Sequence, residues 1–502
     1  MKPAMACTGG PTRPPAPELE DRDGPRDECG VFGIYAPGHE VSRLSFFALY
    51  ALQHRGQESA GIAAADRGGH IITRRELGLV NQVFTENDLS TLAGELAIGH
   101  VRYSTTGSNA WENSQPVQRS VGTRGSQREV ALAHNGNLIN AVELHKELLA
   151  KGVTFSSTSD SEIIAALIAT HPAERVEDAI AEVLPRLKGA FSTVVMTKDR
   201  VVAFRDPHGL RPLALGTLEP TAKAQDDTVR YCVASESCAL DIIGAKFMRD
   251  VQPGEVVTLS EQGCSSKQVV EGARKAFCVF EYIYFARPDS RMNDQVLQVA
   301  RGRMGEILWR EAPVEADVVI AVPDSGNPAA RGLARASGIP QDDGFVKNRY
   351  VARTFIQPGQ ELRKHGLRLK FNPLPAVVAG KRLVVVDDSI VRGNTTRQIV
   401  QMLRDSGAKE VHLRISAPPI KHPCHYGIDM STREEMIAHG RTTQEVAQEL
   451  GCDSLHYLSM AGVYEAIAGT RETHCDACFT GEYPLAGSDG ANGKYALEEE
   501  DD

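Results

Sequence analysis

The sequence predicts an α/β protein with at least two domains. At 502 residues the chain is long enough for two separate cores. Its hydrophobic fraction of 42% and charged fraction of 24% are typical of a globular protein. In the second half, apolar strands repeatedly lead through a loop into an amphipathic helix. Units of this kind predict a mostly parallel sheet that binds ligands at the carboxyl ends of its strands.

The net charge and the cysteines limit the class of protein further. A net charge of −10 argues against a nucleic-acid partner, because no basic face is implied. No apolar stretch approaches the roughly 18 residues of a membrane span, and no signal peptide opens the chain. The ten cysteines are irregularly spaced, which predicts reduced thiols with metal or catalytic roles in a cytoplasmic protein.

The first 28 residues predict a removable prosegment. Residues 1–28 are rich in Pro, Gly and charge and have no apolar run that could pack. They lead directly into an alternating segment that opens with Cys29 and reads as a strand. If the chain is cut after Glu28, Cys29 carries a free α-amine with an ordinary pKa of about 8. That amine can take the proton of the thiol, so no catalytic histidine is needed.

Six motifs follow in the first half of the chain. They are LQHRGQESAGIA from Leu52, GHVRYSTTG from Gly99, NSQPV from Asn113, AHNGNLIN from Ala133, STSDSE from Ser157 and FRDPHGLRPL from Phe204. Taken singly, each has an ordinary interpretation: Arg102 as a surface ion pair, HNGN as a hairpin turn, STSDSE as a helix cap and Cys29 as a small buried hydrophobe. Together with CGVFG and in this order, they resemble the class II glutamine amidotransferases over about residues 29–260.

That resemblance implies an N-terminal-nucleophile domain with an αββα arrangement and assigns roles to five residues. Cys29 is the nucleophile, and Arg102 pairs with the α-carboxylate of glutamine through its planar guanidinium. Asp160 takes the α-amino group. The Asn135 side chain and the Gly136 amide form the oxyanion hole.

The segment LVVVDDSIVRGNTT, Leu383 to Thr396, carries the strongest signal of the second half. An apolar strand leads through a Gly-containing turn into a helix, whose N-terminus is suited to phosphate. Asp387 and Asp388 repel phosphate but suit a ribose diol or hydrated magnesium, and we expect both at a solvent-facing strand end. The ordinary alternative is a strand end with a capping aspartate. The segment resembles the PRPP loop of type I phosphoribosyltransferases.

This second resemblance implies a phosphoribosyltransferase domain over 276–485, after a polar connection at 261–275. Ser325, in the loop Pro323 to Asn327, is expected to meet pyrophosphate and Mg²⁺ together with the two aspartates. A basic segment is expected to cover the substrate. The expected PRPP contacts are Asp387, Asp388, Arg392, Gly393, Asn394, Thr395, Thr396, Lys347 and Arg353, with Arg349 and Lys370 in the same basic segment. AFCVFEYIYFARPDS predicts a long first strand for this domain, and residues 486–502 predict a disordered acidic tail.

The two halves in one chain resemble the amidophosphoribosyltransferase family over roughly residues 29–485. The reaction implied converts glutamine, PRPP and water into 5-phosphoribosylamine, glutamate and pyrophosphate, at the entry to purine synthesis. The resemblance also implies that ammonia passes internally, that purine nucleotides inhibit the enzyme, and that the chain forms a homo-oligomer. Two alternatives remain: a sugar-phosphate amidotransferase, which lacks the paired aspartates, and a nucleotide-sensing regulator, which does not need the glutaminase residues.

The remaining cysteines predict a metal or redox site. Cys475 and Cys478 form a CxxC pair that is ambiguous between the two roles. Cys424 lies in a Pro/Gly-bounded loop, and Cys238 begins a predicted helix, whose dipole lowers a thiol pKa. One branch of the family carries a [4Fe–4S] cluster, and the resemblance implies Cys238, Cys424, Cys475 and Cys478 as its ligands, with zinc as the alternative. Cys278, within the apolar run, is expected to be buried and inert.

Overall fold

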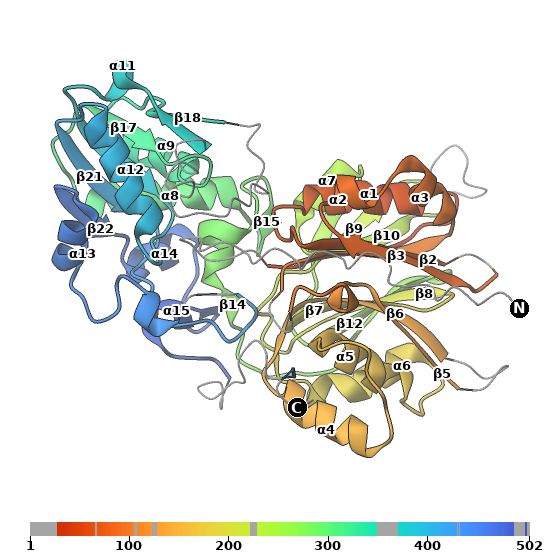
Figure 1. Ribbon diagram of the computed structural model, residues 1–502. Coiled ribbons are helices and arrows are strands. Elements are labelled where there is room, and N and C mark those ends of the chain that lie inside the picture. Colours follow the sequence, from red (N-terminus) through yellow and green to blue (C-terminus); the bar gives the residue numbers. More distant parts are fainter. Residues whose placement is uncertain are drawn as a thin grey trace, which may run out of the picture.

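The computed structural model describes residues 28–65, 68–104, 108–122, 128–220, 228–348, 370–428, 430, 432–485 and 497–498. Two α/β domains lie side by side in it (Figure 1). No helix within those ranges is long and apolar enough to cross a membrane.

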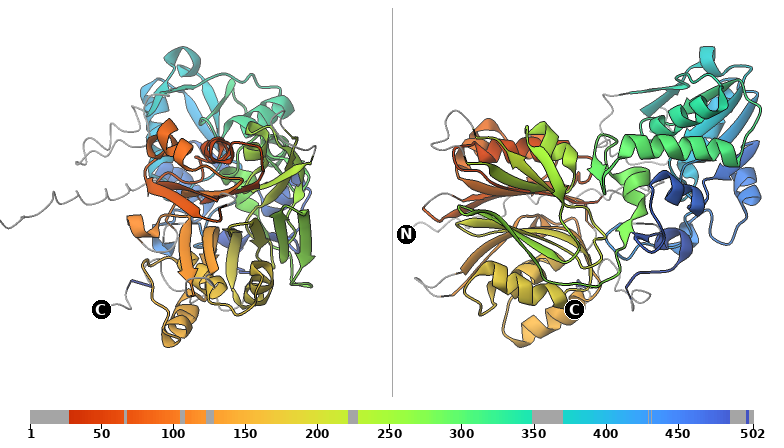
Figure 2. Two further views of the ribbon diagram at one scale, coloured as in Figure 1. Left: turned by 90° about the vertical axis from the view of Figure 1, so that its right-hand side faces the viewer. Right: turned by 180° about the vertical axis from the view of Figure 1, so that it is seen from behind.

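The N-terminal domain contains two antiparallel sheets. The first has the order β11-β9-β10-β1-β4-β2-β3, made of β11 (Lys246–Asp250), β9 (Ala214–Leu218), β10 (Arg230–Ala234), β1 (Gly30–Tyr35), β4 (Leu96–Arg102), β2 (Ser59–Ala65) and β3 (Ile71–Leu77). The second has the order β13-β12-β8-β7-β6-β5, made of β13 (Gly263–Gln268), β12 (Glu255–Ser260), β8 (Arg200–Arg205), β7 (Gly189–Met196), β6 (Arg128–Leu138) and β5 (Val117–Val121). Figure 2 shows the two sheets stacked face to face, with helices outside them.

Successive side chains of each strand point to opposite faces of its sheet, and this divides the domain into layers. Val31 and Ile98 of the first sheet pack against Ala133 and Val194 of the second, in a core between the sheets. The outer face of the first sheet is covered by α1 (Val41–Ala51), α2 (Val80–Val83), α3 (Glu86–Thr91) and α7 (Ser237–Ile242). The second is covered by α4 (Ala141–Ala150), α5 (Asp160–Ala169) and α6 (Val176–Val183). The predicted αββα arrangement is confirmed.

The C-terminal domain is built on a parallel sheet, as predicted. Its order is β17-β20-β21-β22, made of β17 (Val318–Ala321), β20 (Arg382–Asp387), β21 (Glu410–Ile415) and β22 (Ser454–Tyr457). The accompanying helices are α8 (Leu297–Glu311), α9 (Asn327–Ser337), α11 (Pro375–Val378), α12 (Asn394–Asp405), α13 (Thr443–Leu450) and α14 (Met460–Ala466). A separate two-stranded antiparallel sheet consists of β18 (Phe345–Lys347) and β19 (Phe371–Pro373), and Figure 1 shows β18 beside the parallel sheet. The buried side of α12 carries Ile399, Val400 and Leu403, so its apolar spacing predicted the packed face correctly.

The apolar run that opens the C-terminal domain is not one long strand. Only β14 (Phe277–Cys278) is extended, and it pairs in parallel with β23 (His474–Cys475). A π-helix, η3 (Glu281–Phe285), follows it. Most of this run is buried, and a continuous apolar run does not by itself distinguish a buried strand from a buried helix.

One further boundary drawn from the sequence needs correction. The segment 261–275 is only partly a connection, because β13 forms the edge of the second sheet of the N-terminal domain. The ordinary alternative for HNGN, a hairpin turn, is excluded, because these residues lie within β6. Two residues of the predicted tail are described: Leu497 is buried against the N-terminal domain, and Glu498 accepts a hydrogen bond from the Ser108 amide at 2.7 Å.

Candidate active sites

Cys29 lies at the entry to β1, beside the end of β4. Gly30 pairs with Val101, so the thiol comes next to Tyr103. Its Sγ donates to the Tyr103 carbonyl at 3.2 Å and accepts from the Tyr103 amide at 3.4 Å. Burial raises the pKa of Cys29 to about 12, the charge of Arg102 opposes this, and Glu58 and Asp160 add to it. The thiol is therefore protonated and needs a base before it can act as a nucleophile.

Arg102 ends β4 and points into the same buried space. Its Nη2 donates to the Ser108 carbonyl at 3.2 Å, and its Nη1 lies 3.8 Å from a carboxylate oxygen of Glu58. Glu58 is itself held by the Ser104 amide at 2.8 Å. The sequence analysis missed Glu58. In the sequence, Glu58 is marked only by its place directly before the small and apolar residues of β2.

Asn135 and Gly136 lie near the end of β6. Gly136 has φ of +145°, and a Cβ there would come within 1.9 Å of the Ala190 carbonyl oxygen, so only glycine fits. Asn135 is 1% exposed, and within the described residues its Nδ2 has no hydrogen-bond partner. Such a donor costs about 1–3 kcal/mol. A buried amide without an acceptor fits the predicted oxyanion hole.

Asp160 is the first residue of α5, where the helix dipole favours a negative charge. Its Oδ2 accepts from the Leu138 amide at 3.0 Å, and its Oδ1 lies 3.6 Å from His134 Nδ1. These contacts fix the carboxylate beside the end of β6. Arg102 and Asp160 thus lie close enough to Cys29 to affect its charge, and Asp160 contacts His134 and Leu138, which flank Asn135 and Gly136 in β6.

Asp387 and Asp388 lie where β20 ends, but they do not face solvent. They are only 8% and 6% exposed, so the expectation of a solvent-facing strand end is wrong. The Asp388 amide donates to Asp387 Oδ1 at 2.9 Å. Burial and the neighbouring Asp388 charge raise the pKa of Asp387 well above its ordinary value, and Lys370 opposes this shift. A bound cation or sugar hydroxyls would offset the cost of the paired charges.

The turn after the aspartates leads into the N-terminus of α12. Gly393, with φ of +81°, precedes the helix, which begins at Asn394 and contains Thr395 and Thr396 in its first turn. The first amides of a helix lack intrahelical partners and favour anions. The Arg392 Nη2 donates to both carboxylate oxygens of Glu435 at 3.0 and 3.1 Å, on η4 (Arg433–Glu435).

Ser325 lies in the loop between β17 and α9, beside the end of β20. The Val322 amide donates to the Val386 carbonyl at 2.9 Å, and a Cβ at Gly326 would come within 2.4 Å of the same oxygen. Lys347, at the end of β18, forms an ion pair with Asp324 of this loop. The loop therefore lies beside the strand end that carries the aspartates, and Lys347 contacts this loop. Arg349 and Arg353 lie outside the described residues.

Three of the four thiols predicted from the sequence, those of Cys424, Cys475 and Cys478, lie near one another and near Cys278. Burial raises the pKa of Cys478, and the neighbouring thiols of Cys278, Cys475 and Cys424 add to that shift. Cys278 joins the group because β14 and β23 pair with Cys278 opposite Cys475. Within the described ranges, no group of three or more His, Cys, Asp or Glu side chains is arranged as a ligand set for a metal ion.

Cys238 is not part of this group. It begins α7 as predicted, but its Sγ lies 3.7 Å from a carboxylate oxygen of Glu236. The other groups that shift its pKa are Ser290, Arg287 and Asp289 rather than cysteines. The prediction that Cys238 lies with Cys424, Cys475 and Cys478 is therefore wrong.

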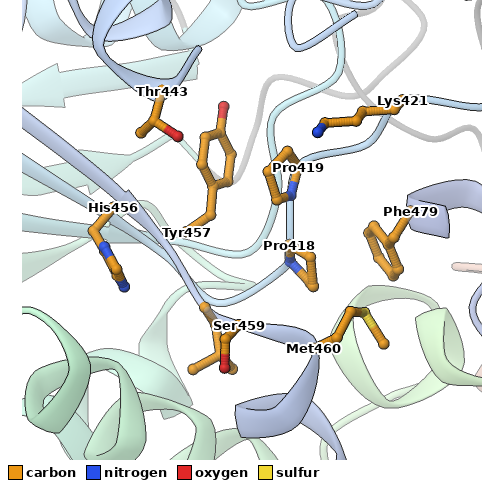
Figure 3. A pocket seen from close by; sticks show the side chains of 10 residues that line it. Pro418, Pro419, Lys421, Thr443, His456, Tyr457, Ser459, Met460 and Phe479 are labelled. Carbon is orange, nitrogen blue, oxygen red and sulfur yellow. The ribbon is translucent and has the colours of Figure 1, made fainter. Parts of the chain in front are cut away.

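A pocket of about 270 Å³ opens at the carboxyl ends of β21 and β22. Figure 3 shows Tyr457 and Ser459 on one side of it and Pro418, Pro419 and Phe479 on the other. Phe479 lies on α15 (Ala477–Thr480), the helix that also carries Cys478. The pocket thus lies at the edge of the sheet where ligands are expected.

Both halves of the chain match known domains. Residues 100–241 match a glutamine amidotransferase domain, and residues 292–427 match a phosphoribosyl transferase domain. The amidophosphoribosyltransferase of Synechococcus elongatus is 50% identical over 472 residues, which cover 93% of each chain.

Two solved structures share the whole arrangement. One is the glutamine phosphoribosylpyrophosphate amidotransferase of B. subtilis complexed with ADP and GMP, with a TM-score of 0.83 at 45% identity, over 91% of this chain and 97% of that one. The other is described as the allosteric regulatory enzyme of purine biosynthesis, with a TM-score of 0.86 at 44% identity, over 93% and 99% of the two chains.

Proposed function

The chain belongs to the amidophosphoribosyltransferase family, and from this premise we propose how its two sites divide the reaction. The enzyme makes 5-phosphoribosylamine from PRPP with glutamine as nitrogen donor and releases glutamate and pyrophosphate, the first step of purine biosynthesis. Family membership excludes the sugar-phosphate amidotransferase and the non-enzymatic regulator that the sequence had left open.

We propose that glutamine is hydrolysed at Cys29. The thiol attacks the side-chain amide and forms a thioester, and ammonia leaves. The α-amine of Cys29, freed by removal of residues 1–28, is the base that the buried, protonated thiol needs. Arg102 and Asp160 bind the α-carboxylate and α-amino groups from opposite sides. The observation that carries this assignment is the buried Nδ2 of Asn135, which has no partner among the described residues and is suited to a developing oxyanion.

We propose that PRPP binds where β17 and β20 end. The amides at the start of α12, from Asn394 to Thr396, take the 5-phosphate, and the carboxylates of Asp387 and Asp388 face the ribose. Ser325 and the two aspartates would hold Mg²⁺, which offsets the charge of pyrophosphate when bound. Lys347, and Arg353 from the covering segment, stabilise the leaving diphosphate by position and charge.

We further propose that Cys278, Cys424, Cys475 and Cys478 hold a [4Fe–4S] cluster. The closeness of the four thiols and the burial of three of them, Cys278, Cys475 and Cys478, support a four-thiolate site, which zinc would also suit. The four residues come from three chain segments, so the bound group would stabilise the C-terminal domain. Protein purified without exposure to air should be brown and hold about four irons per chain. Colourless protein with stoichiometric zinc would instead establish a zinc site.

Three finer properties are also proposed. The B. subtilis relative was solved with ADP and GMP, which supports purine nucleotides as feedback inhibitors of this enzyme. We expect a homo-oligomer of two or four chains, in the cytoplasm.

The two-site proposal is tested with two nitrogen donors. Cys29→Ala should abolish glutamine-dependent synthesis and leave ammonia-dependent synthesis intact, because the thiol serves only the glutaminase site. Cys264→Ala, which alters a half-buried thiol on the edge strand β13, is the matched control and should retain both activities. Equal loss of both activities in Cys29→Ala would overturn the division of labour.

A further inference from the structure

Glu28, the last residue of the proposed prosegment, is buried between two arginines. Its carboxylate lies 3.2 Å from Arg55 Nη1 and also contacts Arg211 Nη1. All three side chains are essentially inaccessible to solvent. Because charged side chains are rarely buried without a specific partner, this placement of the residue before Cys29 requires an explanation.

The two arginines are held in place by other groups. Arg55 Nη2 donates to Glu281 at 2.6 Å and its Nε to Glu236 at 2.5 Å. Arg211 Nε donates to the Tyr426 carbonyl at 3.0 Å. These partners come from both domains, so the positions of the guanidinium groups do not depend on Glu28.

The charges of this cluster balance without Glu28. Arg55 contacts the carboxylates of Glu236 and Glu281, Arg211 Nη1 lies 3.9 Å from Glu281, and His54 also contacts Glu236, at 2.6 Å. Glu28 adds a third carboxylate to the buried group. The charges of Arg55, Arg211, Glu236 and Glu281 therefore still balance after the prosegment is removed, and Glu28 is the residue of the cluster that leaves.

We propose that Arg55 and Arg211 form a recognition site for the carboxylate of Glu28, which selects the residue before the cut and positions the Glu28–Cys29 bond for cleavage. This inference rests on the proposed removal of residues 1–28. It makes Arg55 and Arg211 positioning residues for maturation, separate from the groups that bind glutamine.

The cleavage needs only water as co-reactant. The Cys29 sulfur attacks the Glu28 carbonyl carbon, the bond from that carbon to the Cys29 nitrogen breaks, and the nitrogen takes the thiol proton to become the α-amine. Water then hydrolyses the thioester, which restores the thiol and gives Glu28 an α-carboxylic acid. After this acid ionises, Glu28 carries two negative charges. They lie in a buried cluster whose arginine and glutamate charges already balance without them. The cleaved prosegment is therefore released rather than retained.

The test follows prosegment removal by intact mass over time, in wild-type protein and in E28Q, E28A and E28D. We expect cleavage at least tenfold slower in E28Q and E28A and an intermediate rate in E28D, which keeps the charge on a shorter side chain. E20Q, which neutralises another prosegment carboxylate, is the matched control and should be cleaved at the wild-type rate. Every mature chain lacks residue 28, so cleaved E28Q protein should have wild-type glutamine-dependent activity.

Two results separate failure of this inference from failure of its premise. Cleavage of E28Q at the wild-type rate would overturn the recognition site while leaving prosegment removal in place. Fully active wild-type protein that retains residues 1–28 would overturn removal itself, and the recognition site with it. Uncleaved E28Q should unfold in urea at the same midpoint as the uncleaved E20Q control, which would show that slow cleavage is not misfolding of the N-terminal domain.

Discussion

Asn135→Ala should lower glutamine-dependent activity without weakening the fold. The side chain is buried, and its Nδ2 has no partner within the described residues, so in the free enzyme it contributes no hydrogen bond to stability. In the tetrahedral intermediate it would donate to the oxyanion. Loss of one such donor lowers kcat by about 100- to 1,000-fold, equivalent to about 2.7–4 kcal/mol. Ammonia-dependent synthesis should be unchanged, because it bypasses this step.

The stability effect can be set against that of a nearby asparagine. Asn137 lies two residues along β6, and its Nδ2 donates to the His425 carbonyl at 3.0 Å. Asn135→Ala removes an unsatisfied donor, which relieves about 1–3 kcal/mol, whereas Asn137→Ala removes a made bond worth about 0.5–1.5 kcal/mol. The loss of side-chain volume is the same in both variants. The free energy of unfolding should therefore be higher in Asn135→Ala than in Asn137→Ala by about 1.5–4.5 kcal/mol.

Steady-state kinetics with each nitrogen donor and urea unfolding of both variants measure these quantities. The expected pattern is a catalytic loss without destabilisation at 135 and destabilisation with a smaller catalytic effect at 137. A stability loss at 135 as large as that at 137, or glutamine-dependent kcat within threefold of wild type, would refute the reasoning that this donor is reserved for the reaction.

Three further predictions concern the C-terminal domain. Replacing both Asp387 and Asp388 by Asn should raise the KM for PRPP at least tenfold while leaving the melting temperature unchanged or higher, and unchanged PRPP kinetics would remove these groups from the site. Because burial raises the pKa of Asp387 above its unfolded value, the native state binds that proton more tightly, so the free energy of unfolding of ligand-free protein should fall as the pH rises above about 4. Asp387→Asn should flatten this dependence in denaturant titrations, and an equally steep dependence in the variant would contradict the assignment. Cys278→Ser should lose the visible absorption and the iron of the proposed cluster, whereas Cys238→Ser should keep both, and the reverse result would restore the assignment made from sequence.

Local motifs predicted much of both sites. Cys29 precedes a strand and Asp387 ends one, and the sheet register then fixes their surroundings. Gly136 was predicted for its amide, and the structure adds that no other residue fits there. Such features depend on short segments whose chemistry is visible in the sequence.

The errors arose where distant segments meet. Cys278 lies nearly 200 residues before Cys475, and only the pairing of β14 with β23 brings them together. The burial of Asp387 likewise depends on neighbouring segments, including the loop after β17 that packs against the end of β20. Neither hydrophobic periodicity nor motif spacing reports a contact between segments of this kind.

One such contact links the two activities. Gly427 lies three residues after Cys424, and a Cβ there would come within 2.9 Å of the Gly136 carbonyl carbon. Gly136 is therefore confined between Ala190 of its own domain and Gly427 of the other. Since close-packed groups transmit displacements rather than absorb them, the position of the proposed oxyanion hole depends on the interface between the domains. The geometry of the glutaminase site is thus partly set by the domain that receives its ammonia.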